Sequence, residues 1–227
     1  MKSPIIVALD MESKRALELA KKLNPQECKV KVGSQLFTAD GPIIIDKLNE
    51  LGFDIFLDLK FHDIPNTVKK AVEVAIKMGV WMLNVHSLGG KEMLRAAYEV
   101  VEKVSIKPLL VGVTVLTSLN DKSLKEVGLG LNTEDQVLLL AELCQTEGLN
   151  GVVCSANELS VLRKHLEEDF LLVTPGIRSS GQESDDQKRT STASEAISNG
   201  ADYIVIGREI SNEIDPSEKI RQILETV

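Results

Sequence analysis

The chain has 227 residues, of which 43% are hydrophobic and 26% are charged, and its formal net charge is −8. That length can bury one sizeable core, and the composition is typical of a soluble globular domain. The acidic balance argues against a non-specific nucleic-acid binder, so any anion must be bound by a few locally placed Lys, Arg and backbone N–H groups.

Short runs rich in Val, Ile and Leu alternate with helix-period segments along the chain. Each run ends near a Gly, Pro, polar or charged residue, which is typical of a β-strand. The predicted strands are residues 5–9, 29–33, 53–60, 81–86, 109–116, 151–154, 170–174 and 203–207. The clearest helices are residues 12–23, 65–78 and 216–227, and the last two begin with proline, a favoured first helical residue.

Strict alternation of strand and helix predicts a parallel sheet with right-handed crossovers. Eight such units predict closure, so we expect an α/β fold of the (β/α)8 TIM-barrel type, with residues 1–227 in a single domain. A doubly wound open sheet is the alternative, but no G-x-G-x-x-G motif follows the first strand. The irregular stretch 176–189 follows a strand at the face where barrel active sites lie, and it is either a mobile lid or an ordinary solvated loop.

The third predicted strand carries charges on the face that a barrel turns inward. In FDIFLDLKF, residues 53–61, one parity is entirely apolar, whereas the other holds Asp54, Phe56, Asp58 and Lys60. Asp58 and Lys60 would then lie at the carboxyl end of the strand, one pleat repeat apart. Inward charges are costly there unless they are paired or functional, although a purely structural Asp–Lys pair is the alternative.

Neighbouring segments bring further charges to the same mouth of the predicted barrel. Asp10 ends the first strand, Lys31 has inward parity in the second, and Asp63 follows just beyond the third. Alternating opposite charges can hold one another ionised in a partly desolvated site. Asp63 could instead cap the helix that begins at Pro65.

The ends of the seventh and eighth strands point to a phosphorylated ligand. These strands run into TPGIR and IVIGRE, and the loops in these positions commonly form the phosphate site of such barrels. Gly176 and Gly207 would let backbone amides approach the ligand, while Arg178 and Arg208 supply charge. For Arg208, a surface ion pair with a helix residue is the alternative.

Cysteine usage and apolar runs bear on the compartment. Cys28, Cys144 and Cys154 fit no zinc or redox motif, and an odd, sparse count suits a reducing cytoplasm. The first ten residues hold too short an apolar run for a signal peptide, and residues 109–116 are far too few for a membrane span. We therefore expect a cytoplasmic protein with no metal site and with neither membrane nor nucleic acid as a partner.

Several motifs together resemble those of the orotidine 5′-monophosphate decarboxylases, and the resemblance spans nearly the whole chain. They are ALD (8–10), KVG (31–33), DLKFHDIPNTV (58–68), NVHSLGG (84–90), TVLTSL (114–119), TPGIR (174–178), DDQKR (185–189) and VIGRE (205–209). The resemblance implies decarboxylation of orotidine 5′-monophosphate to uridine 5′-monophosphate in pyrimidine synthesis, without cofactor or metal. It also implies a homodimer with shared active sites.

The resemblance further implies a role for individual residues. Lys60 would be the catalytic acid of a charged array that consists of Lys31, Asp58, Lys60 and Asp63. The substrate-binding residues would be Asp10 at the ribose, Thr117 at the pyrimidine, and Arg178, Gln187, Gly207 and Arg208 at the lid and phosphate. Asp63 and Thr67 would enter from the second subunit. Gln182 competes with Gln187 for the lid position, and spacing from Arg178 favours Gln187.

Two positions depart from the family pattern. Ala193 and Glu209 both stand where the family often has proline. An acidic side chain beside a phosphate is surprising, so Glu209 is expected to point away and cap the start of its own helix. Among the histidines, His86 has inward parity, and a hydrogen-bonded structural role is favoured over lining the mouth.

The residues are compatible with two other functions. One is a related Mg²⁺-dependent barrel, a sugar-phosphate decarboxylase or hexulose-phosphate synthase, and EDTA sensitivity would distinguish it. The other is a catalytically inactive barrel that binds nucleotides or regulates. The complete set of Lys31, Asp58, Lys60 and Asp63 argues against the second, because a mere binder gains nothing from carboxylates placed beside a substrate carboxylate.

Overall fold

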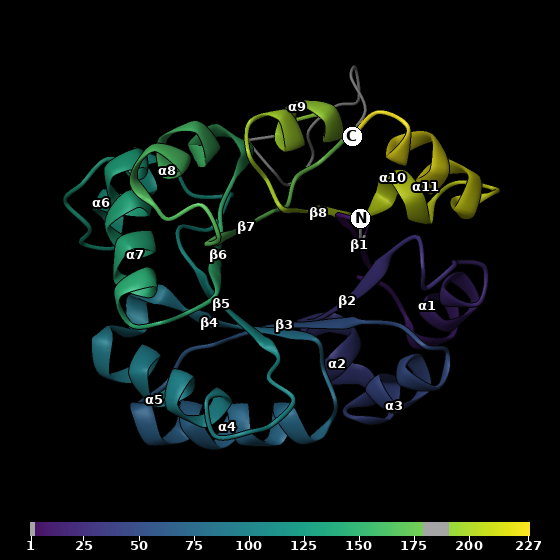
Figure 1. Ribbon diagram of the computed structural model, residues 1–227, viewed down its shortest axis with the longest axis horizontal. Helices are drawn as coiled ribbons and strands as arrows, with labels where there is room; N and C mark the ends of the chain where they lie inside the picture. The colour runs from purple at the N-terminus through teal and green to yellow at the C-terminus, as the bar shows by residue number, and fades with distance from the viewer. Residues whose placement is uncertain (1–2, 179–190) are drawn as a thin grey trace.

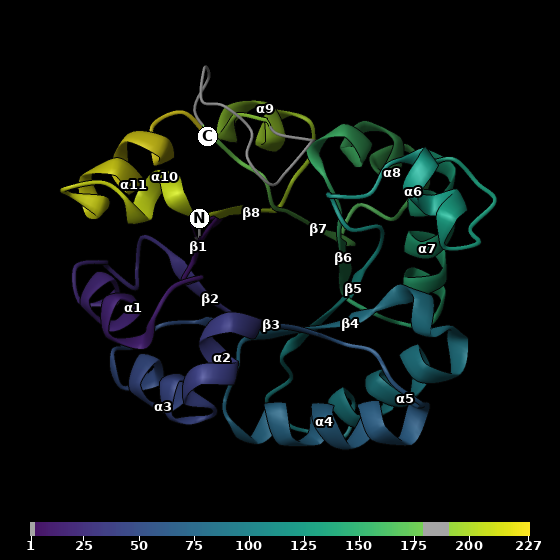
Figure 2. The same cartoon turned by 180° about the vertical axis from the view of Figure 1, so that it is seen from behind.

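The protein forms a closed barrel of eight parallel strands. The computed structural model describes residues 3–178 and 191–227. The strands follow one another around the barrel in chain order, and β8 closes the ring on β1. Figure 1 looks down the barrel and shows the helices as a ring outside the strands, and Figure 2 shows the same ring from behind. The prediction of a (β/α)8 barrel is confirmed, and the open-sheet alternative is wrong.

Each strand lies close to its predicted position. The strands are β1 (Ile5–Ala8), β2 (Lys29–Gly33), β3 (Ile55–Phe61), β4 (Met82–His86), β5 (Leu109–Val113), β6 (Gly151–Val153), β7 (Leu171–Thr174) and β8 (Tyr203–Ile206). The largest difference is in β5, which ends at Val113 rather than at residue 116. Residues beyond Val113 are therefore available to line the mouth of the barrel.

The helices lie outside the barrel and cover it. They are α1 (Ser13–Ala20), α2 (Ser34–Asp40), α3 (Ile43–Glu50), α4 (Pro65–Lys77), η1 (Ser87–Gly89), α5 (Lys91–Val101), α6 (Asp121–Glu126), α7 (Thr133–Thr146), η2 (Ala156–Glu158), α8 (Leu159–His165), α9 (Ala193–Ser198), α10 (Arg208–Ser211) and α11 (Pro216–Leu224). Within the described ranges, no helix combines the length and the apolar character that a membrane crossing requires.

Helix α9 explains how the chain accommodates Ala193. Thr192 is the N-cap, and its hydroxyl accepts a hydrogen bond from the backbone N–H of Glu195 at 3.3 Å. The Glu195 carboxylate in turn accepts the backbone N–H of Thr192 at 3.0 Å, which completes a capping box. Ala193 then occupies the first helical position, where proline is favoured but not required once the cap is present.

The core has two shells. The larger shell packs the outer face of the strands against the helices. The smaller shell fills the inside of the barrel and consists of Ile6, Ala8, Phe56, Met82, Val111, Val173 and Val205. At the amino-terminal end of the strands, the buried Lys29 donates to the carbonyl of Ser3 at 2.9 Å and lies about 5 Å from the rings of Trp81 and Tyr203. The described interior is therefore packed at that end, as is usual for barrels of this size.

Candidate active site

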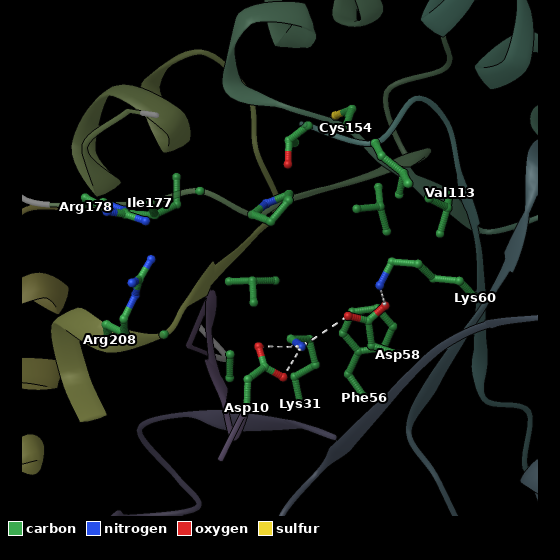
Figure 3. A pocket seen from close by; sticks show the side chains of 18 of the residues that line it. Asp10, Lys31, Phe56, Asp58, Lys60, Val113, Cys154, Ile177, Arg178 and Arg208 are labelled. Atoms are coloured by element: carbon green, nitrogen blue, oxygen red, sulfur yellow. Dashed lines mark hydrogen bonds and ion pairs between the residues drawn. The ribbon is translucent and has the colours of Figure 1, made fainter. Parts of the chain in front are cut away.

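A cavity of about 560 Å³ opens at the carboxyl ends of the strands (Figure 3). Its wall includes the ends of β1, β2 and β3 and the segments that follow β5, β7 and β8. The predicted site residues that line it are Asp10, Lys31, Asp58, Lys60, Thr117, Arg178, Gly207 and Arg208. Seven residues singled out from strand and loop patterns, together with Thr117 from the family resemblance, thus meet at one cavity.

Four charged side chains form a continuous chain of ion pairs along one wall of the cavity (Figure 3). The ammonium nitrogen of Lys31 lies 2.8 Å from Oδ1 of Asp10 and 3.2 Å from Oδ2 of Asp58. The ammonium nitrogen of Lys60 lies 2.6 Å from Oδ1 of Asp58. We call Asp10, Lys31, Asp58 and Lys60 the charged array. It differs from the predicted set in that Asp10, rather than Asp63, is its fourth member within one chain.

Mutual attraction keeps the buried part of the array ionised. Burial alone disfavours the Lys31 ammonium ion, but the carboxylates of Asp58 and Asp10 outweigh this effect and raise the pKa of Lys31 above its ordinary value. Burial likewise disfavours the Asp58 carboxylate, yet Lys31 and Lys60 outweigh it and lower the pKa of Asp58. Both groups are therefore charged at neutral pH, as the alternating pattern predicted.

Lys60 has an unusual backbone conformation. Its φ is 51°, and no other non-glycine residue in the described ranges has a positive φ. An L-residue pays roughly 1–2 kcal/mol for this left-handed region, because its Cβ crowds the backbone. Strain of this kind is found mostly where the surrounding structure enforces it, and often at functional sites.

Asn84 of β4 supports this part of the site, and sequence reasoning did not single it out. Its side chain is fully buried; Nδ2 donates to Oδ1 of Asp58 at 2.6 Å, and Oδ1 accepts the backbone N–H of Lys60 at 2.7 Å. A signal was present in the sequence, since Asn84 is a polar residue of inward parity in the middle of a strand whose other polar residue, His86, stands at its end. Asn84 begins the motif NVHSLGG, but the family resemblance implied no role for it.

His86 does not make the hydrogen bond that was expected of it. Its ring stacks on that of His62 with centroids 5.0 Å apart, and its buried Nδ1 has no partner among the described residues. Burial, followed by the charges of His62 and Lys60, lowers the pKa of His86. The expected hydrogen bond is therefore not made by Nδ1, and the observed contact of His86 is a ring stack.

Two arginines lie on the side of the cavity away from Lys60 (Figure 3). Arg178 follows β7, and its backbone N–H donates to the carbonyl of Ser191 at 2.9 Å. Arg208 begins α10 directly after Gly207. The cavity thus separates a cationic end from the Asp58–Lys60 end, an arrangement suited to a ligand that carries a phosphate far from its reacting atom.

Glu209 is held by a neighbouring helix. Its carboxylate is buried and lies 3.1 Å from the ammonium nitrogen of Lys219 in α11. Glu209 lies in the first turn of helix α10, so the expectation that it stabilises the start of its own helix stays a prediction. The Lys219 pair offsets the negative charge that this departure from the family pattern places near Arg208.

Two of the predicted residues that the structure describes are not brought into the cavity by this chain. Asp63 and Thr67 are exposed, and neither lines the cavity. Oδ1 of Asp63 accepts the N–H of Ile64 at 2.7 Å, and helix α4 has no side-chain cap, so the capping alternative for Asp63 is not found. Gln187, like its competitor Gln182, lies outside the described residues. Among the residues that are described, no three His, Cys, Asp or Glu side chains gather as metal ligands.

A parallel barrel with a partly buried Asp–Lys array at one end of its mouth, and two arginines after strands seven and eight at the other, has the features of the (β/α)8 proteins that bind phosphorylated ligands. The chain belongs to the orotidine 5′-phosphate decarboxylase / HUMPS family, whose model matches residues 3–223. The resemblance inferred from the motifs is therefore confirmed at the level of the family.

Individual relatives are similar to this chain over nearly their whole lengths. Orotidine 5′-phosphate decarboxylase of Dichelobacter nodosus is 53% identical over 226 residues and covers 99% of both chains. The enzyme of the same name from Marinomonas sp. is 51% identical and covers 97% of this chain and 94% of the relative. The crystal structure of orotidine 5′-phosphate decarboxylase from Lactobacillus acidophilus superposes with a TM-score of 0.87 at 37% identity, covering 99% of this chain and 98% of that one.

Proposed function

We propose that this chain decarboxylates orotidine 5′-monophosphate to uridine 5′-monophosphate and carbon dioxide in pyrimidine synthesis. The observation that carries the proposal is the ion pair of Lys60 and Asp58, 2.6 Å apart in the cavity. Curated relatives about half identical over nearly the whole chain bear the name of this activity. The family also includes the alternative sugar-phosphate chemistry, but these names favour the decarboxylase.

The proposed chemistry uses side chains of the protein and water. When the bond between C6 and the carboxylate breaks, its electron pair stays on C6 and carbon dioxide leaves. The Lys60 ammonium group stabilises this developing charge and then gives its proton to C6, and water restores the proton to Lys60. Asp58 holds the ammonium group in place, while Lys31 holds Asp58 ionised from the other side.

Other predicted residues would bind the rest of the nucleotide. We assign Asp10 to the ribose, Thr117 to the pyrimidine, and a phosphate site to the group formed by Arg178, Gln187, Gly207 and Arg208. The position of both arginines on the side opposite Lys60 supports this assignment. Binding energy gained at a remote phosphate can be used to position the reacting carbon.

The proposal includes a homodimer in which Asp63 and Thr67 of each chain complete the cavity of the other. Both residues are exposed in the single chain. Apolar side chains that follow β3, β4 and β5 are exposed as well, namely Ile64 at 67%, Leu88 at 40% and Leu116 at 38%. A two-fold pair could bury such side chains and exchange the polar ones reciprocally.

A cytoplasmic location completes the proposal. Cys28, Cys144 and Cys154 are all buried free thiols. Burial raises the pKa of Cys28 and of Cys144 to about 12, so these thiols are protonated and unreactive at neutral pH. Sparse unpaired cysteines are typical of proteins in a reducing compartment.

Turnover of orotidine 5′-monophosphate by the purified chain and by Lys60→Ala tests the proposal. We expect Lys60→Ala to lose at least about a hundredfold in kcat while still binding uridine 5′-monophosphate, since a general acid typically contributes that factor or more. Lys122→Ala, which changes an 87%-exposed lysine of α6, is the matched control and should turn over normally.

Two results would contradict the proposal. An inactive wild-type chain would remove the assigned reaction, and a Lys60→Ala variant with more than about a hundredth of the activity would remove the role of Lys60. EDTA should leave the activity unchanged. Loss of activity on chelation, with recovery on adding Mg²⁺, would favour the sugar-phosphate alternative.

A further inference from the structure

The pairing of β3 with β4 changes register beside the proposed reacting centre. Leu57 pairs with Leu83, and Phe61 pairs with Val85. Four residue steps on β3 therefore match only two steps on β4. The three residues of β3 within this interval face a single residue of β4, which is Asn84. A regular ladder cannot supply a backbone partner for every one of them.

The Asn84 side chain replaces part of the missing ladder. Its Oδ1 accepts the backbone N–H of Lys60 at 2.7 Å, and its Nδ2 donates to Oδ1 of Asp58 at 2.6 Å. One amide thereby joins the backbone of one array residue to the side chain of another. The chemistry fixes its orientation, because an N–H donor requires the amide oxygen and a carboxylate requires the amide NH₂.

The same contact restrains the left-handed backbone of Lys60. A residue at φ 51° relaxes to the ordinary β region unless its neighbours prevent it. The bond from the Lys60 N–H to a fully buried side chain is one such restraint. Because the Cα–Cβ direction depends on φ, relaxation would redirect the ammonium group away from Asp58.

We propose that Asn84 is a positioning residue: it holds Lys60 in the left-handed conformation that directs its ammonium group at Asp58, and it orients the Asp58 carboxylate for that pair. Asn84 does not line the cavity and acts only through the other two residues. The predicted effect on kcat rests on the proposed decarboxylation. The predicted effect on the backbone of Lys60 does not depend on it.

Only a planar group with one acceptor and one donor on a short stem meets both demands. Alanine meets neither demand. Aspartate is nearly isosteric and keeps the acceptor, but when ionised it places a second carboxylate against Asp58. When protonated, it offers an acceptor and an O–H donor in the positions of the amide. The pH dependence of Asn84→Asp therefore distinguishes positioning from packing.

Steady-state kinetics of Asn84→Ala, Asn84→Asp and the control Leu83→Val test the proposal. Leu83 is the adjacent, equally buried residue of β4 and packs on the opposite face, against the helices. We expect kcat to fall about a hundredfold in both Asn84 variants, since misplacement of a reacting group by about 1 Å can cost that much. Affinity for uridine 5′-monophosphate should stay within about threefold, because Asn84 makes no ligand contact in the cavity.

Two further readouts separate positioning from a loss of stability. The activity of Asn84→Asp relative to the wild type should rise as the pH is lowered from about 8 to about 6, as the introduced carboxyl takes up its proton. Hydrogen exchange of the Lys60 amide, measured by NMR, should become at least about tenfold faster in Asn84→Ala and stay unchanged in Leu83→Val.

The proposal is overturned if Asn84→Ala keeps kcat within about threefold of the wild type, or if Leu83→Val of similar melting temperature loses kcat to the same extent. If the wild type does not turn over orotidine 5′-monophosphate, the proposed function fails. Hydrogen exchange then still decides whether Asn84 holds Lys60: loss of protection in Asn84→Ala alone supports the inference, and retained protection overturns it.

Discussion

The Asp58 carboxylate forms ion pairs with two ammonium groups, and the side chains of the array differ in their exposure to solvent. The Lys31 side chain is 9% exposed and the Lys60 side chain 36%, while Asp10, at the far end of the array, is 52% exposed. Removing the central carboxylate should therefore affect stability more than removing the outer one. Lys31 would keep Asp10 as a partner, which limits the loss.

We expect Asp58→Asn to lower the free energy of unfolding by about 3 kcal/mol at pH 7, the usual lower value for breaking a buried ion pair. Asp10→Asn, the control, should cost less than about 1 kcal/mol because its carboxylate is half exposed. Urea unfolding measures both. Equal losses would show that the central position of Asp58 carries no extra stabilisation.

The sign of the pH dependence follows from the direction of the Asp58 pKa shift. Its pKa is lowered by folding, so the ionised carboxylate contributes stability above its unfolded pKa of about 3.9 and loses it as the pH falls through the folded-state value. The difference in the free energy of unfolding between the wild type and Asp58→Asn should therefore become smaller below about pH 4. A constant difference down to about pH 2 would contradict the assignment.

At the scale of elements, the backbone at the end of β2 lies close to the array. Gly33 ends this strand and pairs with Asp58 of β3. A Cβ added to Gly33 would lie 2.8 Å from Oδ1 of Asp10 and 3.1 Å from the ammonium nitrogen of Lys31. Glycine is needed there because of this close approach, since its φ of −94° is open to any residue.

Gly33→Ala should therefore displace the Asp10 carboxylate and weaken binding of uridine 5′-monophosphate by about 1.5–3 kcal/mol, the value of one charged hydrogen bond. Isothermal titration measures this change. Gly130→Ala, where an added Cβ has no neighbour within 4 Å, should bind as the wild type does. Unchanged binding by Gly33→Ala would mean that Asp10 does not contact the ligand.

Sequence patterns predicted the strands, and most of the described candidate site residues line the cavity, because both depend on local regularities. Apolar runs marked each strand, and alternation along β3 placed Asp58 and Lys60 inward. That argument assumed a regular strand. In the structure, β3 and β4 change register beside Lys60, and Lys60 itself has a left-handed backbone conformation. Both depend on β4, so neither Asn84 nor the strain at Lys60 could be read from β3 alone. The Lys219 partner of Glu209 was missed for the same reason, because it belongs to another helix.

At the scale of the whole molecule, one chain leaves the predicted array incomplete. Asp63 lies beyond β3 and is exposed, so it does not reach Lys60 of its own chain as an ion-pair partner in the described contacts. A symmetric partner would present its own cavity to Asp63. The proposed dimer is therefore tested by asking whether two defective chains can restore each other.

Lys60→Ala and Asp63→Ala should each be nearly inactive. After the two are mixed and their subunits exchange, half of the dimers are mixed, and each mixed dimer has one intact site. Activity should then recover to about a quarter of the wild-type value. Isoelectric focusing under native conditions verifies exchange independently, because the two parents change the charge in opposite directions and the mixed dimer is intermediate between them. If exchange is shown and activity stays at the parental level, Asp63 acts within its own chain.

The packed amino-terminal end of the barrel has a consequence for the traffic of small molecules. Beneath the cavity, the inner shell of apolar side chains and the Lys29–Trp81–Tyr203 contact close the described interior. For the proposed reaction, the nucleotide and carbon dioxide must therefore share one exit. The gas forms at the Lys60 end, and the nucleotide is held by arginines at the rim. Carbon dioxide must therefore pass the bound nucleotide on its way out. The order in which the two products leave is thus set by the shape of the barrel rather than by the chemistry.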